Sequence, residues 1–263
     1  MFEKLIAIIE KEIKLNFRYK INYLGGSITN TLRLTILFLL VYFGLFSLGF
    51  EGIEGLNPKT FIPFILLGGL ISSFFILGFE VFYLKFLSEK YWQTFQAILI
   101  APINKFNLLF GIGLAESIRL MIIFLSITII TYIVIPTKVI YIFAILLVTL
   151  LTYFGILGAG LTKGMITLSN ENYIFIFELI SATWIFLSCL YYPITIFPKA
   201  IQKIVLLNPV YHSVTLIREL WSGSINNSLW THFFWVLGFA VISPLIGVFL
   251  FNKATKTYGI KGY

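Results

Sequence analysis

The chain has 263 residues, of which 59% are hydrophobic and only 11% are charged. Because a soluble domain carries about 25% charged residues, this composition excludes a water-soluble globular protein and indicates a lipid environment. The net charge of +8 would fit nucleic-acid binding in a soluble protein, but here the basic residues flank apolar segments, as they do in membrane proteins. We therefore expect membrane lipid, and no nucleic acid, around this chain.

Residues 2–20 predict an amphipathic helix in the membrane interface, and we extend this interfacial region over residues 1–22. Apolar side chains recur at helical spacing on one side, at Phe2, Leu5, Ile6, Ile9, Ile13 and Phe17. Charged side chains occupy the other side, at Lys4, Glu10, Lys11, Lys14 and Arg18. A helix with two such faces buries its apolar side at the headgroup boundary. The alternative, packing on a separate soluble domain, is weak because the remaining sequence is apolar.

Six apolar segments follow, each long enough to cross a hydrocarbon core of about 30 Å at about 1.5 Å per residue. They lie at Ile28–Leu48, Phe61–Leu84, Leu108–Ile135, Val139–Leu161, Tyr173–Tyr191 and Trp230–Phe251. We therefore expect an all-α membrane protein, with one domain of six transmembrane helices over residues 1–263. Since this bundle uses the whole length, we expect no nucleotide-binding domain among these residues.

The distribution of lysine and arginine predicts that both termini are cytoplasmic. Basic residues are concentrated in the N-terminal helix, in residues 85–105, at Lys163 in the predicted loop 162–172, and after the last span. The opposite loops hold fewer, namely Lys59, Lys138, Lys199, Lys203 and Arg218. Because cytoplasmic loops carry the excess of lysine and arginine, we expect a multi-pass protein of the plasma membrane in this orientation.

The segment 85–105, between the second and third predicted spans, is polar and amphipathic. Ser88 is placed to cap a helix that starts at Glu89. Apolar positions line one face and polar positions the other: Tyr91, Phe95, Ile98 and Leu99 against Glu89, Lys90, Gln93 and Gln96. Pro102 ends the pattern. Such a helix can offer its polar side to a soluble partner; alternatively, it is a hairpin that only closes the loop.

Residues 192–229, between the fifth and sixth predicted spans, predict two short helices on the external side. Pro193, Pro198 and Pro209 alternate with the apolar runs 201–207 and 210–220. Both runs are too short to cross the membrane, so we expect re-entrant or interfacial helices.

Five charged residues fall inside the predicted spans, where each is costly by about 2.5 kcal/mol or more, and one of them is Arg33 in the first span. Glu116 and Arg119 are three residues apart and close enough to pair on one helix face. Glu80 lies near the cytoplasmic end of the second span and Glu178 lies in the fifth. A proton or substrate relay is one interpretation, but we favour pairing or helix-to-helix hydrogen bonds, since most of these residues lie near predicted cytoplasmic ends.

The sequence offers neither a metal site nor a catalytic site. His212 and His232 are the only histidines, there is one cysteine (Cys189), and no HExxH pattern occurs. No nucleophile elbow or phosphate-cradling loop is present either. Gly160 and Gly164 form a GxxxG pattern, which permits close helix approach either within the chain or in a dimer.

Several motifs in order resemble those of the ABC-2 type permeases, the membrane subunits of ATP-driven exporters. Glu89, Thr94, Ala101-Pro102 and Leu109-Phe110-Gly111 resemble the coupling-helix region of that family. Gln93 stands where the family usually has glycine, which would make the helix more regular. Two further segments resemble the opening of the second span and the stretch before the last span: Phe61-Ile62-Pro63-Phe64 with Gly68-Gly69-Leu70, and Asn208-Pro209 with Arg218 and Gly223.

The resemblance implies a permease without a catalytic site, in a homodimer over two ATPase subunits that bind ATP and Mg. The residues implied to couple to the ATPase are Ser88, Glu89, Lys90, Tyr91, Gln93, Thr94 and Phe95. Structural or gating candidates are Glu116, Arg119, Asn208, Pro209 and Arg218. The motifs are closer to the drug- and lipid-exporting branch than to the exporters of polysaccharides or lipid-linked glycans, which are the alternative.

Two rival classes remain open at this point. A proton-coupled secondary transporter would use Glu80, Glu116 and Glu178, but it predicts inverted-repeat symmetry between the two halves, which the sequence does not show. An intramembrane enzyme would need a converging set of nucleophile, base or metal ligands, which the sequence does not offer.

Overall fold

The computed structural model describes residues 2–18, 58–94 and 105–261, together with positions 25, 29, 32 and 36. Its main elements are all helices: α1 (Phe2–Arg18), α3 (Pro58–Tyr91), α5 (Lys105–Val134), α6 (Val139–Ser169), α7 (Tyr173–Phe186), the 3-10 helix η1 (Ile194–Ile196), α8 (Lys199–Val205), α9 (Pro209–Ser222) and α10 (Ser228–Lys261). No β-strand occurs in these described ranges, in agreement with the all-α prediction. The first predicted span, Ile28–Leu48, lies outside the described residues apart from positions 29, 32 and 36.

Four helices are long and apolar enough to cross a membrane. They cover Thr60–Tyr91, Asn107–Val134, Val139–Ser169 and Ser228–Ala254. These helices correspond to the second, third, fourth and sixth predicted spans, and three of them run beyond the predicted ends. The chain is therefore a helical integral membrane protein, with four of the six predicted spans present at full length.

The fifth predicted span, Tyr173–Tyr191, is shorter in the structure. α7 ends at Phe186 and has 14 residues, about 21 Å at about 1.5 Å per residue, which is less than a core of about 30 Å. Cys189 adopts a left-handed φ of 51°. The carbonyls of Cys189 and Leu190 accept hydrogen bonds from Arg218, at 3.1 Å and 2.6 Å. Hydropathy alone would place Cys189 and Leu190 in the helix, but their carbonyl groups are hydrogen-bonded to Arg218 instead.

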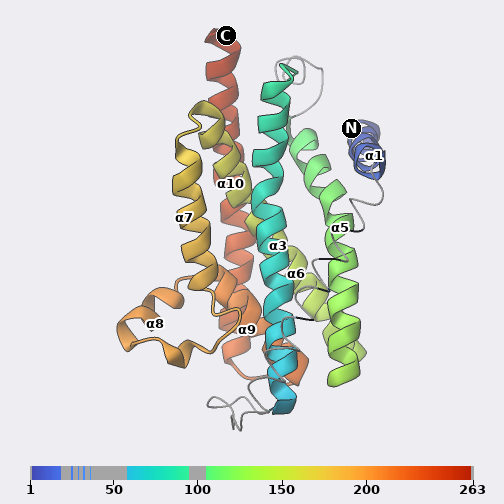
Figure 1. Cartoon of the computed structure of the whole chain (residues 1–263), viewed down its shortest axis with the longest axis vertical. Coiled ribbons are helices and arrows are strands. Elements are labelled where there is room, and N and C mark those ends of the chain that lie inside the picture. The colour runs from blue at the N-terminus through green and yellow to red at the C-terminus, as the bar shows by residue number, and fades with distance from the viewer. Residues whose placement is uncertain are drawn as a thin grey trace.

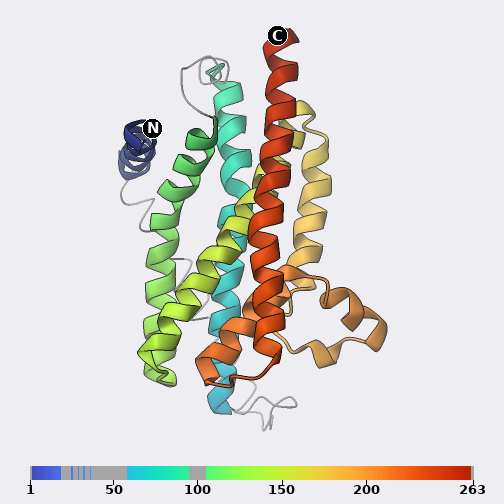
Figure 2. The same cartoon turned by 180° about the vertical axis from the view of Figure 1, so that it is seen from behind.

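The helices form an elongated bundle in which α1, the end of α3 and the end of α10 lie toward one end (Figures 1 and 2). α8 and α9 lie toward the opposite end, near the turn from α5 to α6. α6 runs diagonally through the bundle, and α1 lies across the bundle rather than along it. The N-terminal helix and the two short helices therefore lie toward opposite ends of the bundle, as predicted.

α6 packs closely against both α3 and α10. A Cβ atom at Gly160 would lie 2.7 Å from the carbonyl oxygen of Gly78 on α3. One at Gly158 would lie 2.2 Å from the backbone nitrogen of Pro244 on α10. Both glycines are needed because the backbones touch there. A Cβ atom at Gly164 would lie 3.1 Å from the backbone nitrogen of Tyr83 on α3. The Gly160–Gly164 pattern therefore serves packing within the chain, which was one of the two open interpretations.

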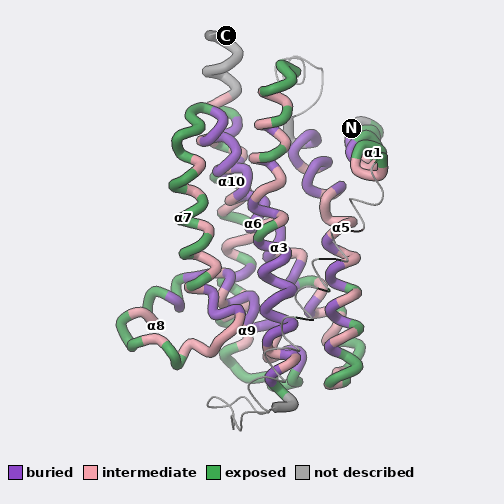
Figure 3. Tube along the Cα trace, viewed as in Figure 1, coloured by how far each residue is buried: buried purple, intermediate pink, exposed green. Residues whose placement is uncertain are grey.

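Burial follows this packing (Figure 3). α3 is mostly buried, with Leu70 and Ile71 fully enclosed, whereas none of the residues of α7 is buried. Much of α10 is also exposed. The described bundle therefore has a tight centre made by α3 and α6 and a loosely covered side at α7 and α10.

We predict that Gly158→Ala destabilises the protein by about 1–3 kcal/mol, because the new methyl group overpacks a backbone contact. Gly238→Ala on α10 is the matched control, since a Cβ atom there meets nothing within 4 Å. Thermal unfolding of both variants in the same detergent measures the difference. Equal melting temperatures for the two variants would contradict the close approach of α6 and α10.

Candidate coupling site

The last turns of α3 carry the residues expected to couple to a partner. The predicted helix that starts at Glu89 with Ser88 as its N-cap is wrong, because α3 continues without a break to Tyr91. The Ser88 hydroxyl instead donates a hydrogen bond to the carbonyl of Lys85, 2.7 Å away. Residues 85–91 contain no proline or glycine, so the polar segment extends the spanning helix rather than starting a new one.

α3 ends in a Schellman turn. The backbone N–H of Thr94 donates to the carbonyl of Glu89 at 3.0 Å, and that of Gln93 donates to Lys90 at 3.1 Å. Gln93 adopts a φ of 56°, the left-handed conformation that this turn requires and that glycine adopts most readily. The expectation that Gln93 makes the helix more regular is therefore wrong. Gln93 instead occupies the turn that ends the helix.

Side chains of the coupling residues bond mainly to the chain itself. Thr94 Oγ1 donates to the carboxylate of Glu89, and Lys90 Nζ lies 2.8 Å from Glu171 in the turn between α6 and α7. Tyr91, which belongs to the apolar face of the predicted helix, is 68% exposed. Phe95 lies outside the described residues. Tyr91 and its neighbour Trp92, which is 79% exposed, form an aromatic part of the exposed surface at this end of α3, beside the exposed polar residues Gln93 and Thr94.

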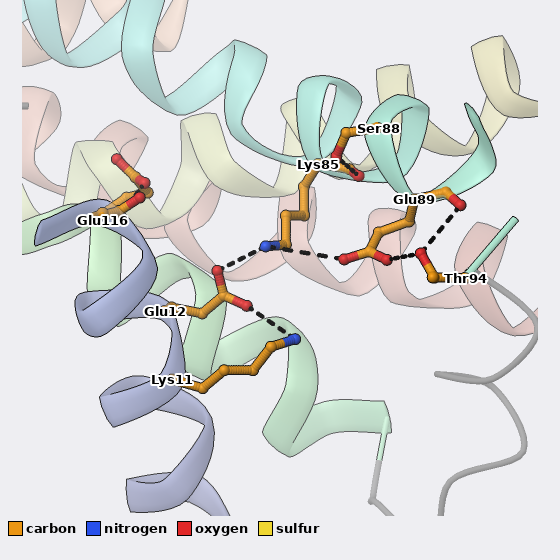
Figure 4. Close-up of polar contacts among 8 residues, drawn as sticks. Lys11, Glu12, Lys85, Ser88, Glu89, Thr94 and Glu116 are labelled. Carbon is orange, nitrogen blue, oxygen red and sulfur yellow. Dashed lines mark hydrogen bonds and ion pairs between the residues drawn. The ribbon is translucent and has the colours of Figure 1, made fainter. Parts of the chain in front are cut away.

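α1 is clamped onto this end of α3 by an ion pair. The carboxylate of Glu12 is 2.8 Å from Lys85 Nζ, and Glu12 is only 6% exposed. Lys85 also lies 4.0 Å from Glu89, so one lysine links α1 to the residues before the Schellman turn (Figure 4). α1 is therefore part of the bundle end, and its inward side carries charge.

A second polar contact joins α1 to α5. Asn16 Nδ2 donates to the Glu116 carboxylate at 2.9 Å, and Arg119 lies 4.0 Å from the other oxygen of Glu116. The predicted pairing of Glu116 with Arg119 is therefore present, although at the limit of an ion pair. Two turns before Asn16 on α1, Ile8 packs on Gly111 of α5. A Cβ atom at Gly111 would lie 2.6 Å from the Ile8 side chain.

These side chains surround a polar cavity of about 260 Å³ between α1, α3 and α5. Its charged and polar lining comprises Glu12, Asn16, Glu80, Lys85, Ser88, Glu116 and Arg119. The sequence analysis named the members on α3 and α5 but missed Glu12 and Asn16. The available signal was their spacing, because Glu12 and Asn16 follow Ile8 at successive intervals of four residues, which places two polar side chains on the apolar side of an amphipathic helix.

Lys163 does not lie where the sequence analysis placed it. It was assigned to a cytoplasmic loop, but α6 continues to Ser169 and Lys163 is fully buried. Its ammonium group contacts the carboxylates of Glu80 on α3 and of Glu178 on α7, the latter at 2.7 Å. Glu80 and Glu178 are thus ion-paired, in agreement with the favoured interpretation of the charged residues in the spans. The sequence analysis did not identify their cation because it placed Lys163 in the predicted loop 162–172.

At the opposite end of the bundle, Arg218 joins α9 to two other segments. Its guanidinium donates to the carbonyls of Phe64 on α3, Cys189 and Leu190 and stacks on the Phe64 ring at 3.4 Å. Because every one of these partners is a backbone carbonyl or a ring, Arg218 acts as a structural brace in this conformation.

Asn208 and Pro209 start α9. The Asn208 side chain accepts from the backbone of Val210 at 2.9 Å and from the Trp184 indole at 2.8 Å. Pro209 follows as the first residue of the helix, where a missing N–H leaves no bond unmade. The same asparagine therefore caps α9 and ties it to α7, which fits the structural role expected for both residues.

Together, these features define an all-helical membrane protein whose cross-lying N-terminal helix is ion-paired to the end of a spanning helix. The sequence model of the ABC-2 type transporter family matches residues 3–221, and the chain belongs to this family. A comparison with curated proteins finds no matching relative. The chain is thus the membrane permease of an ABC transporter, a class that normally works with an ABC ATPase. This membership favours ATP-driven transport over the proton-coupled and enzymatic alternatives.

We predict that Gln93→Gly stabilises the protein by about 1 kcal/mol, because glycine adopts the left-handed conformation without steric cost. The reciprocal control is Gly223→Gln, at the Schellman turn that ends α9 with a φ of 72°. A Cβ atom at Gly223 has room, with its nearest neighbour 3.6 Å away, so conformation alone should destabilise that variant. Changes in melting temperature of opposite sign for the two variants would support both turns. A lower melting temperature in Gln93→Gly would contradict the left-handed turn at Gln93.

We further predict that Glu12 and Lys85 are energetically coupled. A double-mutant cycle with Glu12→Gln and Lys85→Gln should give an interaction of about 1–3 kcal/mol, since both side chains are largely buried and in contact. The exposed pair Glu10–Lys14, 2.6 Å apart, should show no measurable coupling. Denaturant unfolding of each set measures the cycles, and independent effects at Glu12 and Lys85 would show that the pair does not hold α1.

Proposed function

We propose that this permease exports a hydrophobic or amphiphilic compound, drug- or lipid-like, from the cytoplasm with ATP hydrolysed by a separate subunit. The membrane-permease class follows from the family. The direction, the cargo and the two-copy ATPase that binds ATP and Mg are proposals. The observation that supports the coupling role best is the Lys85 network, since it joins α1, α3 and the Schellman turn into one unit.

The coupling unit consists of α1 and residues 85–94. A push on its exposed aromatic surface, Tyr91 and Trp92, would move α3, because the turn and the helix are continuous. α3 packs along α6, which in turn contacts α7 and α10. ATP binding changes the bundle only if the ATPase contacts this unit differently in its two states.

We assign the end that carries α1 to the cytoplasm and place the protein in the plasma membrane. Basic residues are frequent on α1 and after the apolar part of α10, at Lys4, Lys11, Lys14, Arg18, Lys253, Lys256 and Lys261. Lys163 no longer supports this orientation because it is buried, yet the bias remains without it. The external side then holds α8 and α9.

We also propose that two permeases associate. α7 has no buried residue, and Phe175, Ile176 and Leu179 are among its exposed apolar side chains. A helix that contributes so little to its own bundle is well placed to pack against a second copy. The two copies would stand over two ATPase subunits.

An apolar groove beside α7 favours a hydrophobic cargo over a glycan. Its lining is almost entirely apolar and includes six aromatic rings. Sugar hydroxyl groups need hydrogen-bonding partners along their path, which such a lining does not supply.

We predict that Glu89→Ala lowers permease-coupled ATPase activity about fivefold or more, the scale of a typical coupling free energy. Glu89 holds Thr94 and therefore the shape of the turn. The assay uses the permease purified with its ATPase and reconstituted in lipid vesicles. Glu219→Ala, at the other end of the bundle, is the control and should couple normally.

Two outcomes would count against this function. One is the absence of any ABC ATPase in the purified complex. The other is full coupling in Glu89→Ala when the variant has the same melting temperature as the unsubstituted protein, since the turn would then carry no signal.

A further inference from the structure

A groove of about 810 Å³ opens laterally between α7 and α10. Its floor is formed by Phe79 on α3 and by Ala159 and Thr162 on α6. The aromatic members of the lining are Phe79, Phe177, Trp184, Phe234, Trp235 and Phe239. A volume of this order holds a drug-sized molecule, and the ring faces present negative electrostatic potential to whatever lies between them.

The buried ion cluster of α3, α6 and α7 adjoins this groove. Lys163 follows the lining residue Thr162, and Glu178 follows the lining residue Phe177. Lys163 Nζ lies 5.1 Å from the centre of the Phe79 ring, whose side chain belongs to the groove floor. The cluster and the groove are therefore neighbours at the same level of the bundle.

The charges of this cluster do not balance. One ammonium group meets two carboxylates, Glu80 and Glu178, which leaves a formal surplus of one negative charge. The two cations that share a cavity with Glu80 do not cancel this surplus, because Lys85 is paired with Glu12 and Arg119 with Glu116. Glu178 is the carboxylate with access to the surroundings, because its side chain is 53% exposed whereas Lys163 is fully buried. A surplus charge beside apolar surface is costly, and a cation in the groove would offset it.

We propose that the groove binds lipophilic cations, that is, organic cations whose positive charge is attached to an aromatic or otherwise apolar body. The apolar body would lie among the rings on α7 and α10. The positive charge would face the Glu178 side of the groove and the aromatic faces. This inference rests on the proposed function, because the bound cation would be the cargo.

Charge complementarity decides between the possible occupants. An anion of the same shape would meet the surplus carboxylate, and a neutral molecule would leave it uncompensated. A charge about 10 Å away in a partly shielded site changes the affinity about tenfold. The groove should therefore distinguish ions by sign, whereas simple apolar burial would not.

Tetraphenylphosphonium and tetraphenylborate are suitable probes because they have nearly the same shape and opposite charge. The purified permease in detergent micelles, without its ATPase, is dialysed against each radiolabelled ion, and binding to empty micelles is subtracted. Glu178→Gln should weaken tetraphenylphosphonium binding about tenfold without weakening that of tetraphenylborate. Lys163 keeps Glu80 as its partner in this variant, so the bundle is expected to fold.

Two controls separate charge from shape. Phe234→Ala removes an exposed ring of the lining and should weaken both ions. Glu10→Gln removes a carboxylate from α1, on the other side of the bundle from α7 (Figures 1 and 2), and should change neither. Together, these results would support a cation site at the groove.

Tetraphenylphosphonium binding that is absent, or unchanged in Glu178→Gln, would overturn the proposal. A proton resident on Glu178, or a groove filled by another part of the protein, would give one of these results. The proposed function fails separately, by loss of the ATPase or of coupling, because the dialysis needs neither ATP nor a partner.

Discussion

The direct contact of the α6 backbone with α3 and α10 is the constraint on which the rest of the bundle depends. Gly160 and Gly158 allow these contacts because a side chain at either position would overlap the neighbouring backbone. With α6 held so close to α3, Lys163 lies opposite Glu80. α7 lacks such contacts and has no buried residue, so it stands apart from α10 and leaves the aromatic groove between them.

Charges within the bundle have specific partners that join different helices. Lys163 links α6 to α3 and α7, and Lys85 links α3 to α1. Arg218 links α9 to α3 through backbone carbonyls. Because an unpaired charge is expensive away from water, each partnership opposes separation of its helices. Under the proposed function, a push at the end of α3 would be transmitted to the groove through these links.

The coupling segment shows where pattern reading fails and why. An amphipathic pattern after a span predicts a separate helix with its own cap at Ser88, but polar residues with good helix propensity simply prolong α3. Gln93 then ends the helix in a conformation that its residue type disfavours, so neither propensity nor periodicity marks it. The one clue was that the family usually has glycine at this position, and glycine is favoured there because the turn needs a left-handed residue.

The sequence by itself determined the helical membrane class, four long spans, the amphipathic α1, the two short helices before α10 and the proximity of Glu116 to Arg119. These features depend on hydropathy, local spacing and proline positions, all of which act over short stretches of chain. Only the tertiary structure decided that Lys163 is a buried partner of Glu80 and Glu178, that Glu12 clamps α1, and that α7 ends at Phe186. Each of these depends on residues far apart in sequence, and pairing across helices is set by how closely their backbones pack.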